Sequence, residues 1–198
     1  MIEKFEKKVI KAICENDLVY LLKNLDDIDI NMRLKSEDND TLLMYSISDS
    51  DSNVYKHFID KGADLNIDND LGENILHSAI YSGQPERVME AFALERLNKQ
   101  SIECTTPLLL SVGLEEEVIA NFLIDKGADI NCGDNDGNKP IHLASYFGLT
   151  SVVKKLIINR ADIHAKTKKG NLPLALAVNE GHKEIIEMLY RLMYPPLS

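Results

Sequence analysis

Apolar residues recur along the chain in short stripes with helical spacing. One stripe has the positions i, i+1, i+4 and i+5, and it consists of Val152, Val153, Leu156 and Ile157. This spacing places the side chains on one face of an α-helix. The same pattern returns 33 residues later within 185–190. The chain is therefore predicted to contain a series of short helices, each with one buried face.

A longer match repeats with the same period. The segment 137–144 reads GNKPIHLA, the segment 170–177 reads GNLPLALA, and a further copy at 72–79 reads GENILHSA. A second signature, Gly-Ala-Asp-x-Asn, occurs at 62–66 and 127–131. Self-similarity at a fixed period of this length is the sequence signature of stacked structural repeats.

The residue types within one copy predict its local structure. Gly137 suits a turn that needs a positive φ or a close approach of the chain. Pro140 suits the first turn of a helix, where the backbone N–H has no partner in any case. Gly148 is placed to end that helix, and the stripe that begins at Val152 forms a second one. Neither short helix can bury its apolar face alone, so the units are expected to stack into a solenoid.

These copies resemble the ankyrin repeat family. The copy at 134–166 carries the Asp-x-x-Gly opening, the Pro-Ile-His stretch and the Ala-Asp pair that the resemblance rests on. The resemblance implies an all-α solenoid of helix-turn-helix units with β-turn fingers, forming a single domain over 1–198. In this family the fingers and first helices form a concave face, and the second helices line the convex back. The expected repeats are 1–35 (a cap), 36–68, 69–100, 101–133, 134–166 and 167–198 (a cap).

Repeats 2 to 4 depart from the pattern. Asn39 and Cys104 stand where a turn glycine is expected, and Glu115 to Glu117 stand where a glycine would end a first helix. Residues 93–100 lack the finger signature, and we interpret them as a longer second helix. The Ser/Asp cluster at 48–52 predicts the turn between two helices. The departures reflect either drift in a tolerant repeat or a reshaped surface for a partner.

The sequence contains no recognised catalytic motif. It has no GxGxxG loop, P-loop, HExxH helix or GxSxG turn. His77 and His142 fall at the histidine position of the family, where the resemblance implies hydrogen bonds that tie one turn to the next. No histidine has a cysteine or a second histidine at metal-ligand spacing. We therefore expect no enzyme activity, no catalytic, metal-binding or cofactor-binding residue, and no cofactor.

Charge is distributed unevenly along a chain whose formal net charge is -10. Residues 26–70 hold twelve acidic and four basic residues, whereas residues 154–169 hold six basic residues and one acidic residue. This distribution indicates either a solvated surface or electrostatic steering of a basic partner. The basic stretch has no interleaved aromatic residues, which argues against a nucleic-acid partner.

The candidate binding residues lie at concave-face positions that packing leaves free. They are Asp70, Leu71, Glu73, Tyr81, Ser82, Ile102, Glu103, Thr105, Asn135, Asp136, Asn138, Tyr146 and Phe147, and repeat 6 adds Lys168, Lys169, Asn171 and Asn179. Exposed aromatic residues are typical interface anchors, so Tyr81, Tyr146 and Phe147 are the strongest candidates. The alternative for these three is partial burial against the neighbouring repeat.

The sequence predicts a stand-alone module that binds a basic partner protein and masks or inhibits it, as an immunity protein or host-modulating effector would. The alternative is a repeat protein that binds a small molecule or a nucleic acid. We expect no membrane partner, because no apolar run is long enough to span a bilayer. The three cysteines contain no CxxC pair, and the N-terminus lacks an apolar signal region. These features favour the cytoplasm, or delivery into a host cell without a cleavable signal. We expect the protein to be a monomer on its own.

Overall fold

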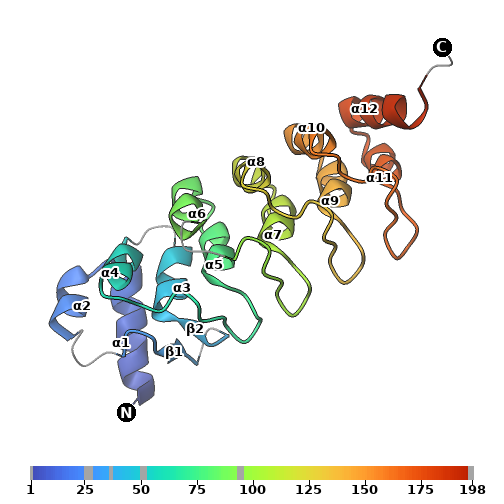
Figure 1. The fold of residues 1–198 in the computed structure, drawn as a ribbon. Coiled ribbons are helices and arrows are strands. Elements are labelled where there is room, and N and C mark those ends of the chain that lie inside the picture. The colour runs from blue at the N-terminus through green and yellow to red at the C-terminus, as the bar shows by residue number, and fades with distance from the viewer. Residues whose placement is uncertain (1, 25–28, 36–37, 50–52, 93–95, 196–198) are drawn as a thin grey trace. The chain divides into compact units, whose positions relative to one another are not determined.

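The structure is a computed structural model that consists of paired helices joined by long connecting segments (Figure 1). The residues it describes are 2–24, 29–35, 38–49, 53–92 and 96–195. The chain divides into two compact units, residues 1–96 and 97–198. The architecture in both units is mostly helical, which confirms the predicted all-α helix-turn-helix fold. The expected single domain with six repeats stays a prediction.

The first unit contains six helices and a short hairpin within its described residues. Its elements are α1 (Ile2–Cys14), α2 (Leu18–Asn24), β1 (Arg33–Leu34), β2 (Asp40–Thr41), α3 (Leu42–Ser48), α4 (Val54–Asp60), α5 (Ile75–Tyr81) and α6 (Pro85–Phe92). Helix α3 packs against α4 and α5, α5 packs against α6, and α1 packs against α2. Strands β1 and β2 pair antiparallel, with Arg33 opposite Thr41.

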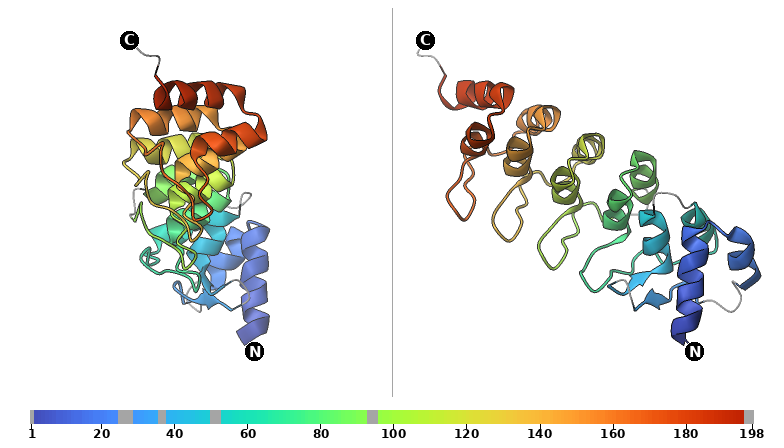
Figure 2. Two further views of the ribbon diagram at one scale, coloured as in Figure 1. Left: turned by 90° about the vertical axis from the view of Figure 1, so that its right-hand side faces the viewer. Right: turned by 180° about the vertical axis from the view of Figure 1, so that it is seen from behind.

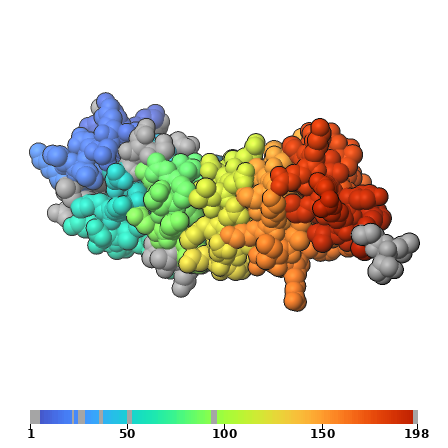
Figure 3. Space-filling view, turned by 90° about the horizontal axis from the view of Figure 1, so that it is seen from above, coloured from blue at the N-terminus to red at the C-terminus, as the bar shows by residue number. Residues whose placement is uncertain are grey.

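The second unit is built of three helix pairs. They are α7 (Pro107–Gly113) with α8 (Glu117–Asp125), α9 (Pro140–Phe147) with α10 (Thr150–Ile158), and α11 (Pro173–Glu180) with α12 (Lys183–Met193). The first helices α7, α9 and α11 pack side by side, and the second helices α8, α10 and α12 form a neighbouring layer (Figures 1 and 2). Figure 3 looks onto the side of the second helices, where yellow, orange and red segments lie next to one another.

Helix boundaries in the second unit follow the glycine and proline pattern. Each first helix begins at a proline, and Thr106 caps α7 by accepting a hydrogen bond from the Leu109 N–H at 3.2 Å. Gly148 ends α9 with φ of 76° and Gly181 ends α11 with φ of 79°, a left-handed conformation that favours glycine. The predicted two short helices per unit are therefore confirmed in both complete copies, 137–158 and 170–193.

In the first helices α3, α5, α7, α9 and α11, one position holds a small, fully buried side chain. Its occupants are Ser46, Ala79, Ser111, Ala144 and Ala177, each with 0% exposure. Helix α9 packs against both α7 and α11, so Ala144 lies in the seam between first helices. A small residue there lets the backbones approach closely, which explains why the sequence keeps Ser or Ala at this position.

The departures in repeats 2 and 4 keep the backbone path of the regular repeats. Asn39, Cys104 and Glu115 have φ of 56°, 59° and 60°, in the same left-handed region as Gly137 at 75°. A residue with a Cβ pays about 1–2 kcal/mol for this conformation. The substitutions therefore cost stability locally but leave the turn geometry intact.

The interpretation of 93–100 as a longer helix is wrong for residues 96–100. Helix α6 ends at Phe92, Arg96 has φ of 66°, and Leu97 and Asn98 form a turn. The Asn98 Oδ1 accepts a hydrogen bond from the Asp129 N–H at 2.8 Å, which links it to the next finger. This link between the Asn98 side chain and the Asp129 backbone stabilises the turn even though the Gly-Ala-Asp signature is lost. Residues 93–95, and residues 50–52 of the predicted Ser/Asp turn, lie outside the described residues.

A buried arginine completes the core of the first unit. Arg87 is only 3% exposed, and its Nη1 donates to the backbone carbonyls of Ser46, Ile47 and Asp49 at the end of α3. Its guanidinium also lies 5.0 Å from the ring centroid of Tyr55. Carbonyls at a helix C-terminus lack intrahelical partners. A glycine turn often supplies backbone N–H donors to such carbonyls, and at the end of α3 Arg87 supplies the donors instead.

Candidate protein-binding site

The segments that enter the first helices of the second unit project to one side as fingers (Figures 1 and 2). They comprise residues 97–106, 126–139 and 159–172. Each finger is tied to the next, because the Asp129 N–H donates to Asn98 and the Asp162 N–H donates to Asn131, at 2.8 and 3.2 Å. We call the surface of these fingers and the adjoining side of α7, α9 and α11 the finger face.

The finger face carries the eight candidate residues of repeats 4 and 5, in addition to Lys168, Lys169 and Asn171 of repeat 6. Ile102 is 64% exposed, and Glu103, Asn135 and Asp136 are also exposed, whereas Thr105 and Asn138 are half-buried. The Asn138 Nδ2 donates to Asp134 at 2.9 Å, so its side chain stabilises the finger. The other two candidates, Tyr146 and Phe147, come from the end of α9.

Tyr146 and Phe147 form an aromatic pair. Their rings meet edge to face with centroids 5.0 Å apart, and Tyr146 is 43% exposed while Phe147 is half-buried. The His182 Nε2 donates to the Tyr146 carbonyl at 2.8 Å, and its ring lies against Gly148, where any Cβ would come within 2.6 Å of the imidazole. The backbone that carries the pair is therefore held in place by the next repeat.

Two adjoining hollows open on the finger face. The first, of about 190 Å³, is lined by residues that include Asp136, Tyr146, Lys169 and Asn171, and we call it the Tyr146 hollow. The second, of about 280 Å³, is lined by Glu103, Thr105, Asp134, Asn135 and Asp136, and we call it the Glu103 hollow. Asp136 lines both, so the two hollows form one continuous polar surface across three fingers.

The candidates of the first unit are placed differently from expectation. Asp70 is exposed and accepts a hydrogen bond from Asn39 Nδ2 at 2.6 Å, and Leu71 is half-buried. Glu73 is only 9% exposed and accepts from the Tyr81 hydroxyl at 2.7 Å, while the Tyr81 ring is 49% exposed. Ser82 is 8% exposed, and its hydroxyl donates to the Ala79 carbonyl at 2.6 Å.

Glu73 and Ser82 therefore do not lie on the presented surface. Glu73 turns inward because the Tyr81 hydroxyl and the Asn69 amide both donate to its carboxylate. Ser82 turns inward because its hydroxyl bonds to the last turn of α5. Repeat position predicts which way the backbone faces. The direction of the Glu73 and Ser82 side chains depends in addition on the hydrogen-bond partners near them.

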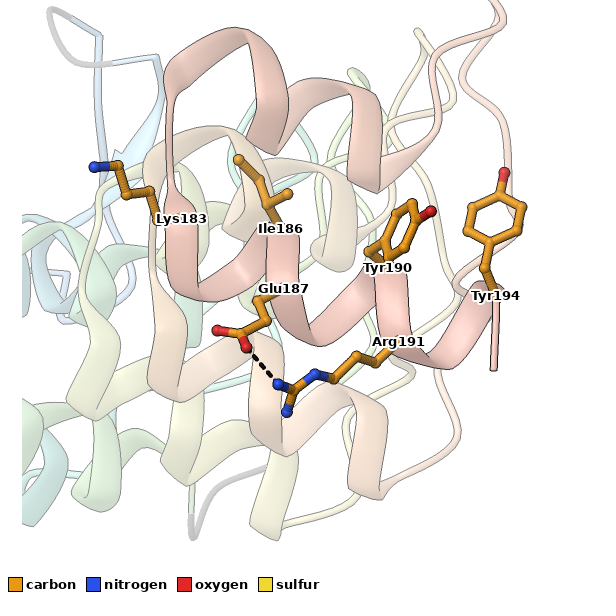
Figure 4. A pocket seen from close by; sticks show the side chains of 6 residues that line it. All are labelled: Lys183, Ile186, Glu187, Tyr190, Arg191 and Tyr194. Atoms are coloured by element: carbon orange, nitrogen blue, oxygen red, sulfur yellow. Dashed lines mark hydrogen bonds and ion pairs between the residues drawn. The ribbon is translucent and has the colours of Figure 1, made fainter. Parts of the chain in front are cut away.

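An exposed apolar strip on α12 was not among the candidates. The sequence pattern predicts Ile185, Ile186, Leu189 and Tyr190 as one buried face. Ile185 and Leu189 are buried, but Tyr190 is 56% exposed and Ile186 is half-buried. Tyr190 on α12 and Tyr194 directly after its end have ring centroids 5.1 Å apart, near the Glu187–Arg191 ion pair (Figure 4). Helix α12 packs against α10 and α11, so this strip faces away from both of them.

The histidine predicted to tie adjacent turns together does so in the second unit. His142 is fully buried, its Nδ1 accepts from the Lys139 N–H at 3.1 Å, and its Nε2 donates to the Ala165 carbonyl at 3.0 Å. Burial lowers the pKa of the imidazole below its ordinary value of 6.5, and the nearby Lys139 charge acts in the same direction. The neutral ring with its proton on Nε2 satisfies both bonds.

Two general properties concern ion binding and membranes. In the part of the chain that the structure describes, no three His, Cys, Asp or Glu side chains gather in an arrangement that could hold a metal ion. Across the same residues, none of the helices combines the length and the apolar character needed to cross a membrane.

Cys132 accepts a hydrogen bond from Gln100 Nε2 at 2.9 Å, and burial together with the Asp129 charge raises the pKa of its thiol.

Stacked helix pairs with linked fingers define the class of the protein as a helical repeat protein. The family model described as "Ankyrin repeats (3 copies)" matches residues 9–90, 86–167 and 115–194. The chain therefore belongs to the ankyrin repeat family. Members of this family are generally protein–protein interaction modules without catalytic activity of their own.

Curated relatives are ankyrin repeat proteins or proteins that contain a matching region. The chain is 26% identical over 161 residues to "Putative ankyrin repeat protein FPV031" of Fowlpox virus, covering 77% of this chain and 47% of that protein. It is 24% identical over 190 residues to "Putative ankyrin repeat protein L371" of Acanthamoeba polyphaga mimivirus, covering 91% and 25%. It is 29% identical over 141 residues to "Neurogenic locus notch homolog protein 1" of Homo sapiens, covering 70% and 6%. The chain thus spans less than half the length of each of these relatives.

Proposed function

We propose that the finger face of the second unit binds a basic partner protein and masks the surface it covers. The observation that carries this proposal is the aromatic pair of Tyr146 and Phe147 beside two polar hollows. Tyr146 keeps 43% of its surface exposed next to the fully buried Ser145. A partly exposed aromatic side chain on a rigid backbone is a favourable interface anchor, because little entropy is lost when it is covered.

Charge supports a basic partner. The carboxylates of Glu103 and Asp136 form no ion pair or hydrogen bond with any side chain among the described residues. Unpaired acids around an aromatic anchor speed encounter with a cationic surface and contribute specificity. Binding by the whole of such a face requires about 800 Å² on each partner, and inhibition follows if the covered area includes the partner's own functional site.

We further propose that the protein acts in a reducing compartment such as the cytoplasm, its own cell's or that of a host. Cys14, Cys104 and Cys132 are free thiols, and Cys14 is exposed. Exposed free thiols persist where glutathione keeps them reduced.

The test is capture of partners by the full chain from a lysate of the source cell, followed by mass spectrometry. The chain and two double variants are compared: Tyr146→Ala with Phe147→Ala, and Tyr190→Ala with Tyr194→Ala. The second variant is a matched control, because it also removes two contacting aromatic rings from an exposed surface of the same unit.

We expect the first double variant to lose the partner and the second to retain it. Circular dichroism and thermal melting should show that both variants remain folded, since neither pair lies in the buried core. Loss of the partner with the α12 variant alone would place the interface on α12 and overturn the proposal.

A further inference from the structure

The Tyr146 hollow contains polar groups whose hydrogen-bonding capacity is not used within the protein. Among the residues that the structure describes, no side-chain hydrogen bond or ion pair occupies the Asp136 carboxylate, the Tyr146 hydroxyl, the Lys169 ammonium or the Asn171 amide. Asp136 does anchor the neighbouring finger, but through its carbonyl, which accepts from the Lys168 N–H at 2.9 Å. The side chains are thus presented by an ordered backbone and remain available to a ligand.

The size of the hollow indicates what it can hold. At about 190 Å³ it is smaller than the roughly 300–1,000 Å³ of sites that enclose a drug-sized molecule. A single side chain of a bound protein fits this scale better than an independent small molecule does.

The chemistry of the lining favours one side chain in particular. A guanidinium stacks on aromatic faces and forms paired hydrogen bonds with a carboxylate, whereas a lysine ammonium acts as a compact point charge. Tyr146 and Asp136 supply the ring and the carboxylate on the walls of the same hollow. The Lys169 ammonium and the Asn171 amide can donate to backbone carbonyls of the segment that carries the side chain.

We propose that the Tyr146 hollow receives an arginine side chain from an extended segment of the partner, and that the Glu103 hollow receives a second basic side chain of the same segment. This inference rests on the proposed function and adds to it the chemistry of the recognised motif. In the second hollow the Asp134 carboxylate is already used by Asn138 and by finger N–H groups. Because Asp136 pairs with the arginine of the first hollow, Glu103 supplies the free carboxylate for the second basic residue.

The repeat spacing sets the distance between the two basic residues. The Glu103 hollow lies between the first and second fingers and the Tyr146 hollow between the second and third, so one repeat separates them. Packed neighbouring helices are about 8–10 Å apart. In a polyproline II segment, every third side chain returns to the same side after a rise of about 9 Å. In a β-strand, residues i and i+2 share a face at only about 7 Å. The geometry therefore fits an Arg-x-x-Arg or Arg-x-x-Lys motif in polyproline II conformation. The Glu103 hollow is lined by three acidic residues and no basic one, so it would repel the phosphate groups of a nucleic acid.

The experiment titrates the full, isotope-labelled chain with blocked synthetic peptides of equal charge. They contain Arg-Pro-Arg, Arg-Pro-Pro-Arg or Arg-Pro-Pro-Pro-Arg, and each is flanked by glycines. We expect the Arg-Pro-Pro-Arg peptide to bind most tightly and to shift the amide resonances of Glu103, Asp136 and Tyr146. The Asp136→Asn variant should bind it about tenfold more weakly. Glu180→Gln is the matched control, because it removes the same charge from an exposed residue that lines neither hollow, and its affinity should be unchanged.

Equal affinity for the three spacings, equal weakening by the Asp136 and Glu180 variants, or resonance shifts confined to α12 would overturn the inference. The proposed function fails separately. If no peptide binds but the variant lacking Tyr146 and Phe147 still loses its captured partner, the finger face is an interface that reads a different motif. If the peptides bind as expected but that variant retains its partner, the hollow binds the motif, and the captured partner binds at another surface.

Discussion

At the scale of single residues, side chains in this protein depart from the repeat pattern while the backbone keeps it. Asn39, Cys104 and Glu115 adopt the left-handed conformation that the pattern assigns to glycine. Conversely, Glu73 and Ser82 occupy regular backbone positions but turn inward to local hydrogen-bond partners. Stacking of the repeats determines the backbone path, whereas the direction of each side chain depends on the hydrogen-bond partners close to it.

Replacement of Glu115 by glycine should stabilise the protein. Its φ of 60° costs a residue with a Cβ about 1–2 kcal/mol, and glycine removes this strain. The greater entropy of glycine in the unfolded chain offsets only part of the resulting stabilisation. We expect the free energy of unfolding to rise by about 0.5–1 kcal/mol in urea titrations. Glu116 is the matched control, because its φ is -81° and Glu116→Gly should lower stability by a similar amount. Destabilisation by both variants would contradict the assignment of strain to Glu115.

His142 should make stability depend on pH. Its pKa in the folded chain lies below the ordinary 6.5, so the unfolded chain binds a proton that the folded chain does not as pH falls below that value. The contribution of the neutral His142 side chain to the free energy of unfolding is fully present above about pH 6.5. It is lost as pH falls towards the pKa of His142 in the folded chain.

Urea titrations at several pH values between 8 and 5 should compare the wild type with His142→Gln. The wild type should be more stable at high pH, because the imidazole links Lys139 to Ala165, and its advantage should shrink below about pH 6.5. Lys169→Ala, which leaves the imidazole in place, should follow the wild-type pH profile. An advantage of His142 that is constant with pH would refute this account.

At the scale of elements, the seam between first helices is the tightest constraint. Ala144 is fully buried on α9 between α7 and α11. Ala144→Leu should overpack this seam and lower stability by about 1–3 kcal/mol in thermal or urea unfolding. Ala175→Leu inserts the same side chain at an exposed position of α11 and should change stability by less than about 0.5 kcal/mol. Equal stability of the two variants would mean that the first helices are not packed as described.

Most helices could be predicted from the sequence because glycine, proline and the apolar stripes mark their ends and faces. Helices α9 and α11 begin at Pro140 and Pro173 and end directly before Gly148 and Gly181. The turn at 96–98 was missed because the glycine, alanine and aspartate of the finger signature are absent there, while Asn98 keeps the link to the Asp129 N–H that Asn131 makes to the Asp162 N–H. The buried Arg87 was missed for a similar reason. Arginine is ordinarily exposed, and only the fold reveals that the end of α3 needs its donors.

The candidate site was predictable in outline only. Repeat register correctly directed attention to Tyr146, Asp136 and Glu103 as residues at the surface. The two hollows that these residues line require side chains from three fingers and from the first helices to converge, including Thr167 and Leu176, which repeat register did not single out. Such convergence depends on rotamers and packing, which a periodic pattern does not specify.

At the scale of the whole molecule, stability should be graded along the chain. Stability in repeat proteins is approximately a sum of unit and nearest-neighbour terms. Strained non-glycine residues at positive φ, including Asp38, Asn39, Arg96, Cys104 and Glu115, gather within 36–117. Amide hydrogen exchange should therefore be faster in 36–117 than in 134–190, where glycine occupies most of the corresponding positions. Uniform protection over both segments would contradict this gradient.

The most direct test of the central claim measures binding kinetics between the full chain and its captured partner by surface plasmon resonance. Tyr146→Ala with Phe147→Ala should accelerate dissociation at a cost of about 2 kcal/mol or more and leave the association rate nearly unchanged. Glu103→Lys with Asp136→Lys should instead slow association, and more strongly at low salt, because the exposed carboxylates steer a basic partner. Unchanged rates for both double variants would show that the partner binds elsewhere, and would contradict the assignment of the finger face as the interface.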